Sequence, residues 1–130
     1  MSIMMVFEFE GFPSVEKLLS VLESLGAYVK IEDPGFVGSF SESNAFFVYS
    51  KNSSLEEIAT DQENPLGWEV GARLVVHCPI GALAESAKEL DDFMDALVSA
   101  VDTRFLLSFQ YESIYAVRDR DLLVYKKIIE

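Results

Sequence analysis

The feature that most constrains the fold is a change in the spacing of apolar residues along the chain. Apolar residues recur at every second position, then at every third or fourth position, and then at every second position again. Residues 68–78 alternate strictly, and this pattern predicts a strand with one buried face. The apolar side of that strand consists of Trp68, Val70, Ala72, Leu74, Val76 and Cys78. Residues 82–101 then carry apolar side chains at helical spacing and predict the longest helix, which Pro79 and Gly81 separate from the strand.

The same order of periods occurs in the first half of the chain. Residues 4–10 alternate, with Met5, Phe7 and Phe9 on one side and Glu8 and Glu10 on the other, and so predict a strand with one side in solvent. Residues 13–25 follow as a predicted helix with Pro13 at its first position and Gly26 behind its last. Further strands are predicted at 29–32, 36–40, 44–50, 104–110, 113–118 and 122–129. The order suggests two β-α-β-β-β halves. We therefore expect an α+β fold, with two helices packed on one face of a mainly antiparallel sheet.

Length and composition favour a single domain over residues 1–130. Half of the 130 residues are apolar, which suffices for one core without metals or disulfides. Residues 52–67 contain four carboxylates and no base, so they are expected to form an exposed acidic connection. The first residues lack a basic leader, and no apolar run is long enough to span a bilayer, so a cytoplasmic location without membrane contact is expected.

The net charge of the chain favours some classes of binding partner over others. A net charge of −12 disfavours nucleic-acid binding, which depends on Lys and Arg. Carboxylates concentrate between residues 51 and 73 and again between 85 and 102. These segments either steer the chain toward a basic protein or serve only as solubilising charge, and composition alone does not separate the two.

Few residues are suited to catalysis. The single cysteine, Cys78, and the single histidine, His77, exclude an internal disulfide and a Cys/His zinc site, and no cofactor or metal is expected. As neighbours on a strand they point to opposite faces, which opposes a thiol and base pair. His77 shares a polar face with Glu69 and Arg73, and this group motivates the alternative hypothesis of a small α+β enzyme or ligand-binding domain that uses surface carboxylates.

The C-terminal third resembles a known class of proteins. Residues 105–119 read FLLSFQYESIYAVRD, and this segment resembles the tail of small acidic immunity proteins encoded beside bacterial secreted toxins. The resemblance implies a cytoplasmic protein without catalytic residues that binds its cognate toxin and covers the toxin's active site. It also implies that carboxylates face a basic cleft in the toxin.

On this hypothesis the contact residues come from the two acidic segments. The first choice is Glu56, Glu57, Asp61, Glu63, Trp68 and Glu69. The second choice is Glu89, Asp92 and Asp95. The expected function is therefore that of an immunity-type toxin inhibitor. Self-association is left open.

Overall fold

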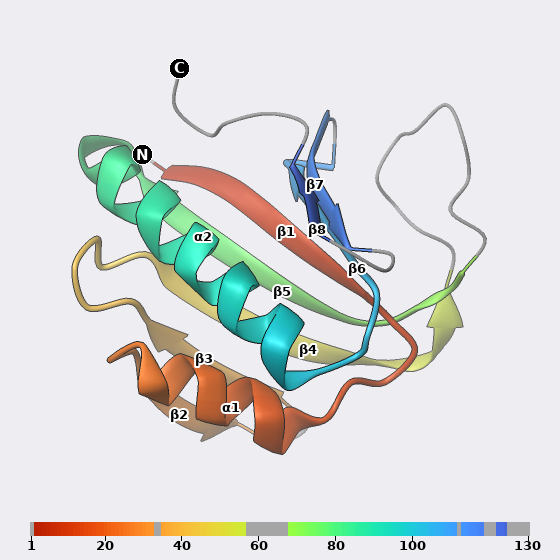
Figure 1. Cartoon of the computed structure of the whole chain (residues 1–130). Helices are drawn as coiled ribbons and strands as arrows, with labels where there is room; N and C mark the ends of the chain where they lie inside the picture. Colours follow the sequence, from red (N-terminus) through yellow and green to blue (C-terminus); the bar gives the residue numbers. More distant parts are fainter. Residues whose placement is uncertain (1, 33–34, 57–67, 112, 119–121, 125–130) are drawn as a thin grey trace.

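The computed structural model describes residues 2–32, 35–56, 68–111, 113–118 and 122–124. Eight strands form a single sheet, and two helices and one short 3-10 segment connect them (Figure 1). The elements in chain order are β1 (Ser2–Glu10), α1 (Val15–Ser24), β2 (Tyr28–Glu32), β3 (Gly35–Ser39), β4 (Phe46–Glu56), β5 (Val70–Pro79), η1 (Ile80–Ala82), α2 (Leu83–Ala100), β6 (Phe105–Phe109), β7 (Ser113–Arg118) and β8 (Leu122–Val124).

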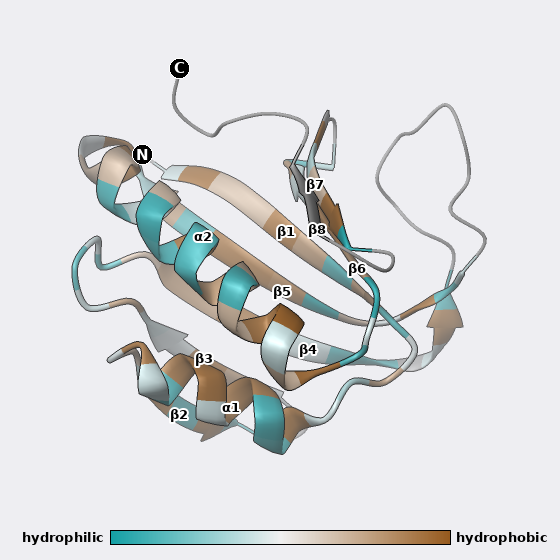
Figure 2. Ribbon diagram, viewed as in Figure 1, coloured by the Kyte–Doolittle hydropathy of each residue, from teal (hydrophilic) through white to brown (hydrophobic). Residues whose placement is uncertain are grey.

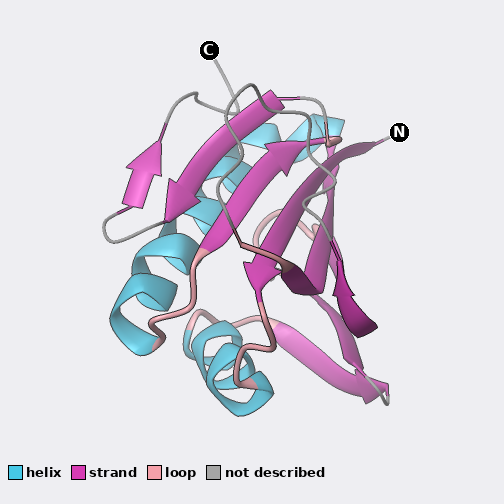
Figure 3. Cartoon of the chain, turned by 90° about the vertical axis from the view of Figure 1, so that its right-hand side faces the viewer, coloured by secondary structure: helices cyan, strands magenta, loops and turns pink. Residues whose placement is uncertain are grey.

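The strand order is β2-β3-β4-β5-β1-β6-β7-β8, and every neighbouring pair of strands is antiparallel. Both helices lie on the same side of this sheet, as Figure 3 shows from the side. The predicted α+β class is confirmed. The β-α-β-β-β order also recurs, but the halves differ in arrangement: α1 leads from β1 to the outer strand β2, whereas α2 leads from β5 across β1 to β6.

The main core fills the space between the sheet and the two helices. Met5, Phe7 and Phe9 on β1 point toward the helices and are buried. The apolar side of each helix faces them, and Figure 2 shows the opposite, outward side of α2 as hydrophilic. Phe7 meets Phe93 of α2 edge to face, with ring centroids 5.3 Å apart. Each such aromatic ring contributes roughly 1.5–3 kcal/mol through burial, so the helices are anchored by their contact with the central strand.

The first helix begins two residues later than the position of Pro13 predicts, at Val15. Ser14 is the N-cap, and its hydroxyl accepts a hydrogen bond from the backbone N–H of Lys17 at 3.3 Å. Pro13 therefore lies outside the helix. A serine N-cap accepts a hydrogen bond from an N–H group of the first turn that would otherwise have no partner. Proline at the first helical position lacks an N–H group of its own but supplies no acceptor for the others. Gly26 follows the last turn with a φ of 82°, as predicted for the residue that closes the helix.

A β-bulge at Gly71 corrects the prediction that Trp68 and Val70 share a face with Ala72. The register of β1 with β5 shifts between Phe9 and Glu10, so that one residue of β5 is left without a partner on β1. Trp68 and Val70 consequently face away from the helices. They form a second, smaller buried cluster with Leu106 and Val117.

The predicted acidic connection at 52–67 begins later than expected, because β4 continues through Glu56. In this last part of β4, the side-chain amide of Asn52 donates a hydrogen bond to the carbonyl oxygen of Val70 at 3.0 Å, which ties β4 to β5. Residues 57–67 lie outside the described residues. No helix among the described residues has the length and apolarity required to cross a bilayer.

Candidate functional site

The outward side of α2 is a strongly charged surface of the described chain. Its helix carries five carboxylates and a single base, Lys88. The buried positions of α2 all lie on the sheet side, so the charged residues collect on the opposite side. Together with one residue of the β3–β4 connection they form what we call the acidic face: Glu42, Glu85, Glu89, Asp91, Asp92 and Asp95.

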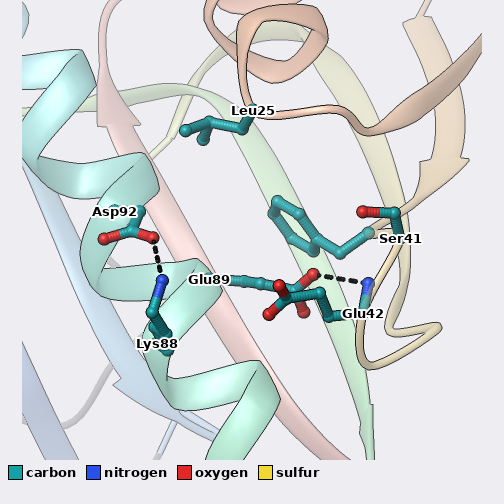
Figure 4. A pocket seen from close by; sticks show the side chains of 7 residues that line it. Leu25, Ser41, Glu42, Lys88, Glu89 and Asp92 are labelled. Carbon is teal, nitrogen blue, oxygen red and sulfur yellow. Dashed lines mark hydrogen bonds and ion pairs between the residues drawn. The ribbon is translucent and has the colours of Figure 1, made fainter.

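A groove of about 170 Å³ lies beside this helix, between α2, the end of α1 and the residues that follow β3 (Figure 4). Leu25 and the buried ring of Phe40 supply its apolar lining. Glu42, Glu89 and Asp92 supply its carboxylates. The groove therefore combines a small apolar surface with a negative rim, an arrangement suited to a basic side chain that has an apolar stem.

Two of the groove carboxylates already have partners in the chain. The Glu89 carboxylate accepts hydrogen bonds from the backbone N–H of Glu42 at 3.0 Å and of Ser43 at 3.3 Å, so it holds the connection between β3 and β4 against α2. Lys88 Nζ lies 3.1 Å from the Asp92 carboxylate. This hydrogen bond and the nearby negative charges raise the pKa of Lys88, which stays protonated.

The structure brings the second-choice contact residues together. Glu89, Asp92 and Asp95 all lie on the acidic face. Glu89 binds the backbone as described, whereas Asp95 is exposed on the outermost part of the helix. Asp95 is therefore the predicted residue whose carboxylate a partner reaches most directly. Asp92 comes next, because its side chain is 47% exposed and its one described partner, Lys88, is itself exposed.

The first-choice residues lie elsewhere. Glu56 ends β4, whereas the groove residues Phe40, Ser41 and Glu42 precede the start of β4, so this 11-residue strand lies between them. The Trp68 ring is only 8% exposed and packs in the smaller cluster, and Glu69 is exposed. Glu57, Asp61 and Glu63 lie outside the described residues.

A buried ion pair on the helix-free side of the sheet was not predicted. Glu8 is fully buried, and its Oε2 accepts hydrogen bonds from Arg73 Nη2 at 3.3 Å and Nε at 3.4 Å. Arg73 Nη1 also donates to Glu56 at 2.9 Å. Burial disfavours the charged guanidinium, but the bond to Glu56 and the charge of Glu8 outweigh this effect and raise the pKa of Arg73. The available sequence signals were Met4 and Val6, apolar residues on the side of β1 that the alternation assigned to solvent.

The residues of the alternative, enzymatic hypothesis are not assembled into one group. His77 and Arg73 share the helix-free side, but Val75 lies between them, and four residues of strand separate them by roughly 13 Å. The His77 ring stacks against Phe46, with centroids 6.3 Å apart. Among the residues that the structure describes, no three His, Cys, Asp or Glu side chains gather closely enough to hold a metal ion.

Cys78 points into the core, on the side opposite His77, as the alternation predicts. Burial raises the pKa of the Cys78 thiol to about 11, and the neighbouring Ser86 hydroxyl opposes this effect only in part. The thiol is therefore protonated at neutral pH and has the character of a small apolar core residue.

Comparisons with known proteins give no relatives: no family model, no curated protein and no solved structure matches the chain.

Proposed function

We propose that this protein is an immunity-type inhibitor that binds a basic toxin through the acidic face of α2. The observation that carries the proposal is the separation of charge within the fold. Five carboxylates and one base lie on α2. On the helix-free side, by contrast, Arg73 pairs with Glu8 and Glu56. Among the described residues, α2 thus concentrates negative charge on its outward side.

Such an arrangement favours association with a positively charged cleft. Electrostatic steering by one strongly charged face raises association rates by roughly 10- to 1,000-fold over a neutral pair. The groove beside Asp92 then offers a place for one basic side chain of the partner, whose stem packs on Leu25. Binding in this scheme requires no bond-making chemistry from the inhibitor.

The choice of a toxin as the partner rests on the resemblance of residues 105–119 to immunity proteins. In the fold, this segment spans β6 and β7, and Phe105, Leu106 and Leu107 are buried. The similar residues therefore belong to the scaffold. The proposed contacts come from α2, so the two lines of argument are independent.

The test is calorimetric titration against the protein encoded immediately upstream, at low and at high salt. The test variant is Asp92→Asn combined with Asp95→Asn. The matched control is Glu32→Gln combined with Glu69→Gln, which removes the same number of charges from exposed residues outside α2. We expect the α2 variant to bind about tenfold more weakly at low salt and the control to bind nearly as the native chain does.

The other outcomes are equally informative. Weaker binding by the control alone would place the contact outside α2, at the end of β2 or just before β5, and would contradict the acidic-face proposal. Binding that neither variant changes and that salt does not weaken would contradict the acidic-face proposal. Absence of binding to the upstream protein would reject that protein as the partner.

A further inference from the structure

The outer strand β2 is unusually apolar for a sheet edge. It pairs with β3 on one side, and no strand among the described residues pairs with its other side. Tyr28 is 70% exposed and Ile31 is 61% exposed. They lie on opposite faces of the strand, because alternate residues point to opposite sides of a sheet. Exposed apolar side chains beside free backbone N–H and C=O groups form a template for another strand.

The charged residues of β2 are complementary to themselves in one register. Lys30 and Glu32 are exposed on the same face, two residues apart, with Ile31 between them. An antiparallel pairing with a two-fold axis at Ile31 places Lys30 of each copy opposite Glu32 of the other. It also places Ile31 opposite its own counterpart. We propose that β2 binds β2 of a second copy of this chain in this register, so that the two sheets become continuous.

The charge of the whole molecule favours this edge over other faces for self-association. The strongly acidic helix α2 packs on β5, whereas α1 packs beside β2 (Figure 1). The width of β2, β3 and β4 therefore separates each α2 from the two-fold axis, at roughly 4.8 Å per strand. Two copies with a net charge of −12 each thus meet with their α2 helices well apart, which weakens the repulsion between these helices.

The neighbouring register is disfavoured by the same residues. A two-fold axis at Lys30 would place this lysine opposite its own counterpart, and like charges directly opposite each other destabilise a strand pair. In the proposed register residues 30–32 of each β2 lie opposite residues 30–32 of the other copy, and so short a pairing buries less surface than a standard protein interface. The dimer is therefore expected to be weak and to depend on concentration.

Sedimentation velocity from low micromolar to near-millimolar concentration tests the proposal on the full chain. The variants are Lys30→Glu, Glu32→Lys and the double exchange. Glu69→Lys is the matched control, an equal charge reversal at an exposed residue away from β2. We expect each single variant to weaken dimerisation by about tenfold, because two cross-strand attractions become two repulsions. The double exchange should restore dimerisation to the native level, and the control should leave it at that level.

Mixing the two single variants gives a further readout. One copy then presents two acids and the other two bases, so the mixture forms a heterodimer more readily than either variant dimerises alone. Circular dichroism of each variant separates loss of pairing from loss of folding. A native chain that stays monomeric throughout would overturn the proposal. A dimer that tolerates both single reversals would also overturn it, because its interface would lie elsewhere.

Discussion

The C-terminal end of α2 is held by Arg118, a residue of β7 that is 6% exposed. Its Nη1 donates to the carbonyl oxygens of Val101 at 2.5 Å and Thr103 at 3.3 Å, and its Nη2 donates to that of Val98 at 3.3 Å. The last turn of α2 contains no basic residue of its own. The buried guanidinium therefore supplies the positive charge and the donors that a helix end requires.

Replacement of this arginine is expected to destabilise the fold strongly. Arg118→Met keeps the apolar stem but leaves three carbonyl groups without their donor, and we expect a loss of about 3 kcal/mol in the free energy of unfolding. Urea denaturation measures this loss. Lys17→Met is the control, because Lys17 is exposed on α1 and should change stability little. An unchanged urea midpoint for Arg118→Met would show that the bonds to the helix end contribute nothing net.

Two buried side chains that can lose a proton, a thiol and a phenol, predict a loss of stability at alkaline pH. Burial raises the pKa of the Cys78 thiol from 9.0 to about 11 and that of the Tyr49 hydroxyl from 10.0 to about 12. Above pH 9.0 the unfolded thiol loses its proton while the folded thiol keeps it. The unfolded state is then favoured, and stability falls by up to about 1.4 kcal/mol per pH unit for each group.

Urea titrations at a series of pH values measure this decline. Stability from these groups is fully present below pH 9.0 and is lost as the pH approaches about 12. Cys78→Ala removes the first part of the decline, so its stability should begin to fall only where Tyr49 starts to titrate, near pH 10.0. Parallel curves for the native chain and Cys78→Ala would contradict the raised pKa of the thiol.

Among the elements, the bulge in β5 depends on a glycine. A Cβ atom built on Gly71 would lie 1.9 Å from the carbonyl oxygen of Gly11 and 2.9 Å from the ring of Phe12. Neither the backbone of Gly11 nor the bulge can shift without disturbing the pairing of β1 with β5. We expect Gly71→Ala to cost about 2 kcal/mol of unfolding free energy in thermal or urea denaturation.

Gly81 provides the matched control for this substitution. It lies in η1, and a Cβ atom there would meet nothing within 4 Å. Gly81→Ala should therefore be neutral or stabilise the chain by a few tenths of a kcal/mol, because alanine restricts the unfolded chain. Equal effects of the two substitutions would show that the close approach at Gly71 is relieved at no cost.

The elements with a clear period were predictable from the sequence, and those set by tertiary contacts were not. The helical stripe of α2 and the alternation of β1 follow from burial on one side, which the order of residues records directly. Glu8 was assigned to solvent because alternation shows only which residues share a face. It does not show that both faces of a central strand are covered. Strand order likewise arises from contacts between distant segments, and no local pattern encodes them.

The candidate site was predictable only in part, for a related reason. The carboxylates of α2 could be assigned to one side of a helix from their spacing, so Asp92 and Asp95 were found together. The groove beside them also needs Leu25 and Phe40, which the fold brings in from the other half of the chain. Trp68 was predicted to share the buried face of Ala72, because the bulge that turns it into the smaller cluster leaves no periodic signal.

For the molecule as a whole, the acidic face is a departure from the arrangement that would stabilise the fold best. Asp91 and Asp92 lie four and three residues before Asp95, and like charges at these spacings repel each other on a helix. A chain selected for stability alone would place a lysine at this position.

Asp95→Lys separates the two explanations of the charge. It turns two repulsive pairs into attractive ones, so we expect the unfolding free energy to rise by about 0.5–1 kcal/mol at low salt and by less at high salt. If the acidic face binds a basic partner, the same variant binds about tenfold more weakly, because one attraction becomes a repulsion at the centre of the contact. Ser99→Lys, an added base one turn further along the exposed side of α2, is the control for position. Gain of stability without loss of binding would mean that the carboxylate serves solubility alone, whereas gain with loss means that α2 keeps a destabilising charge because the partner requires it.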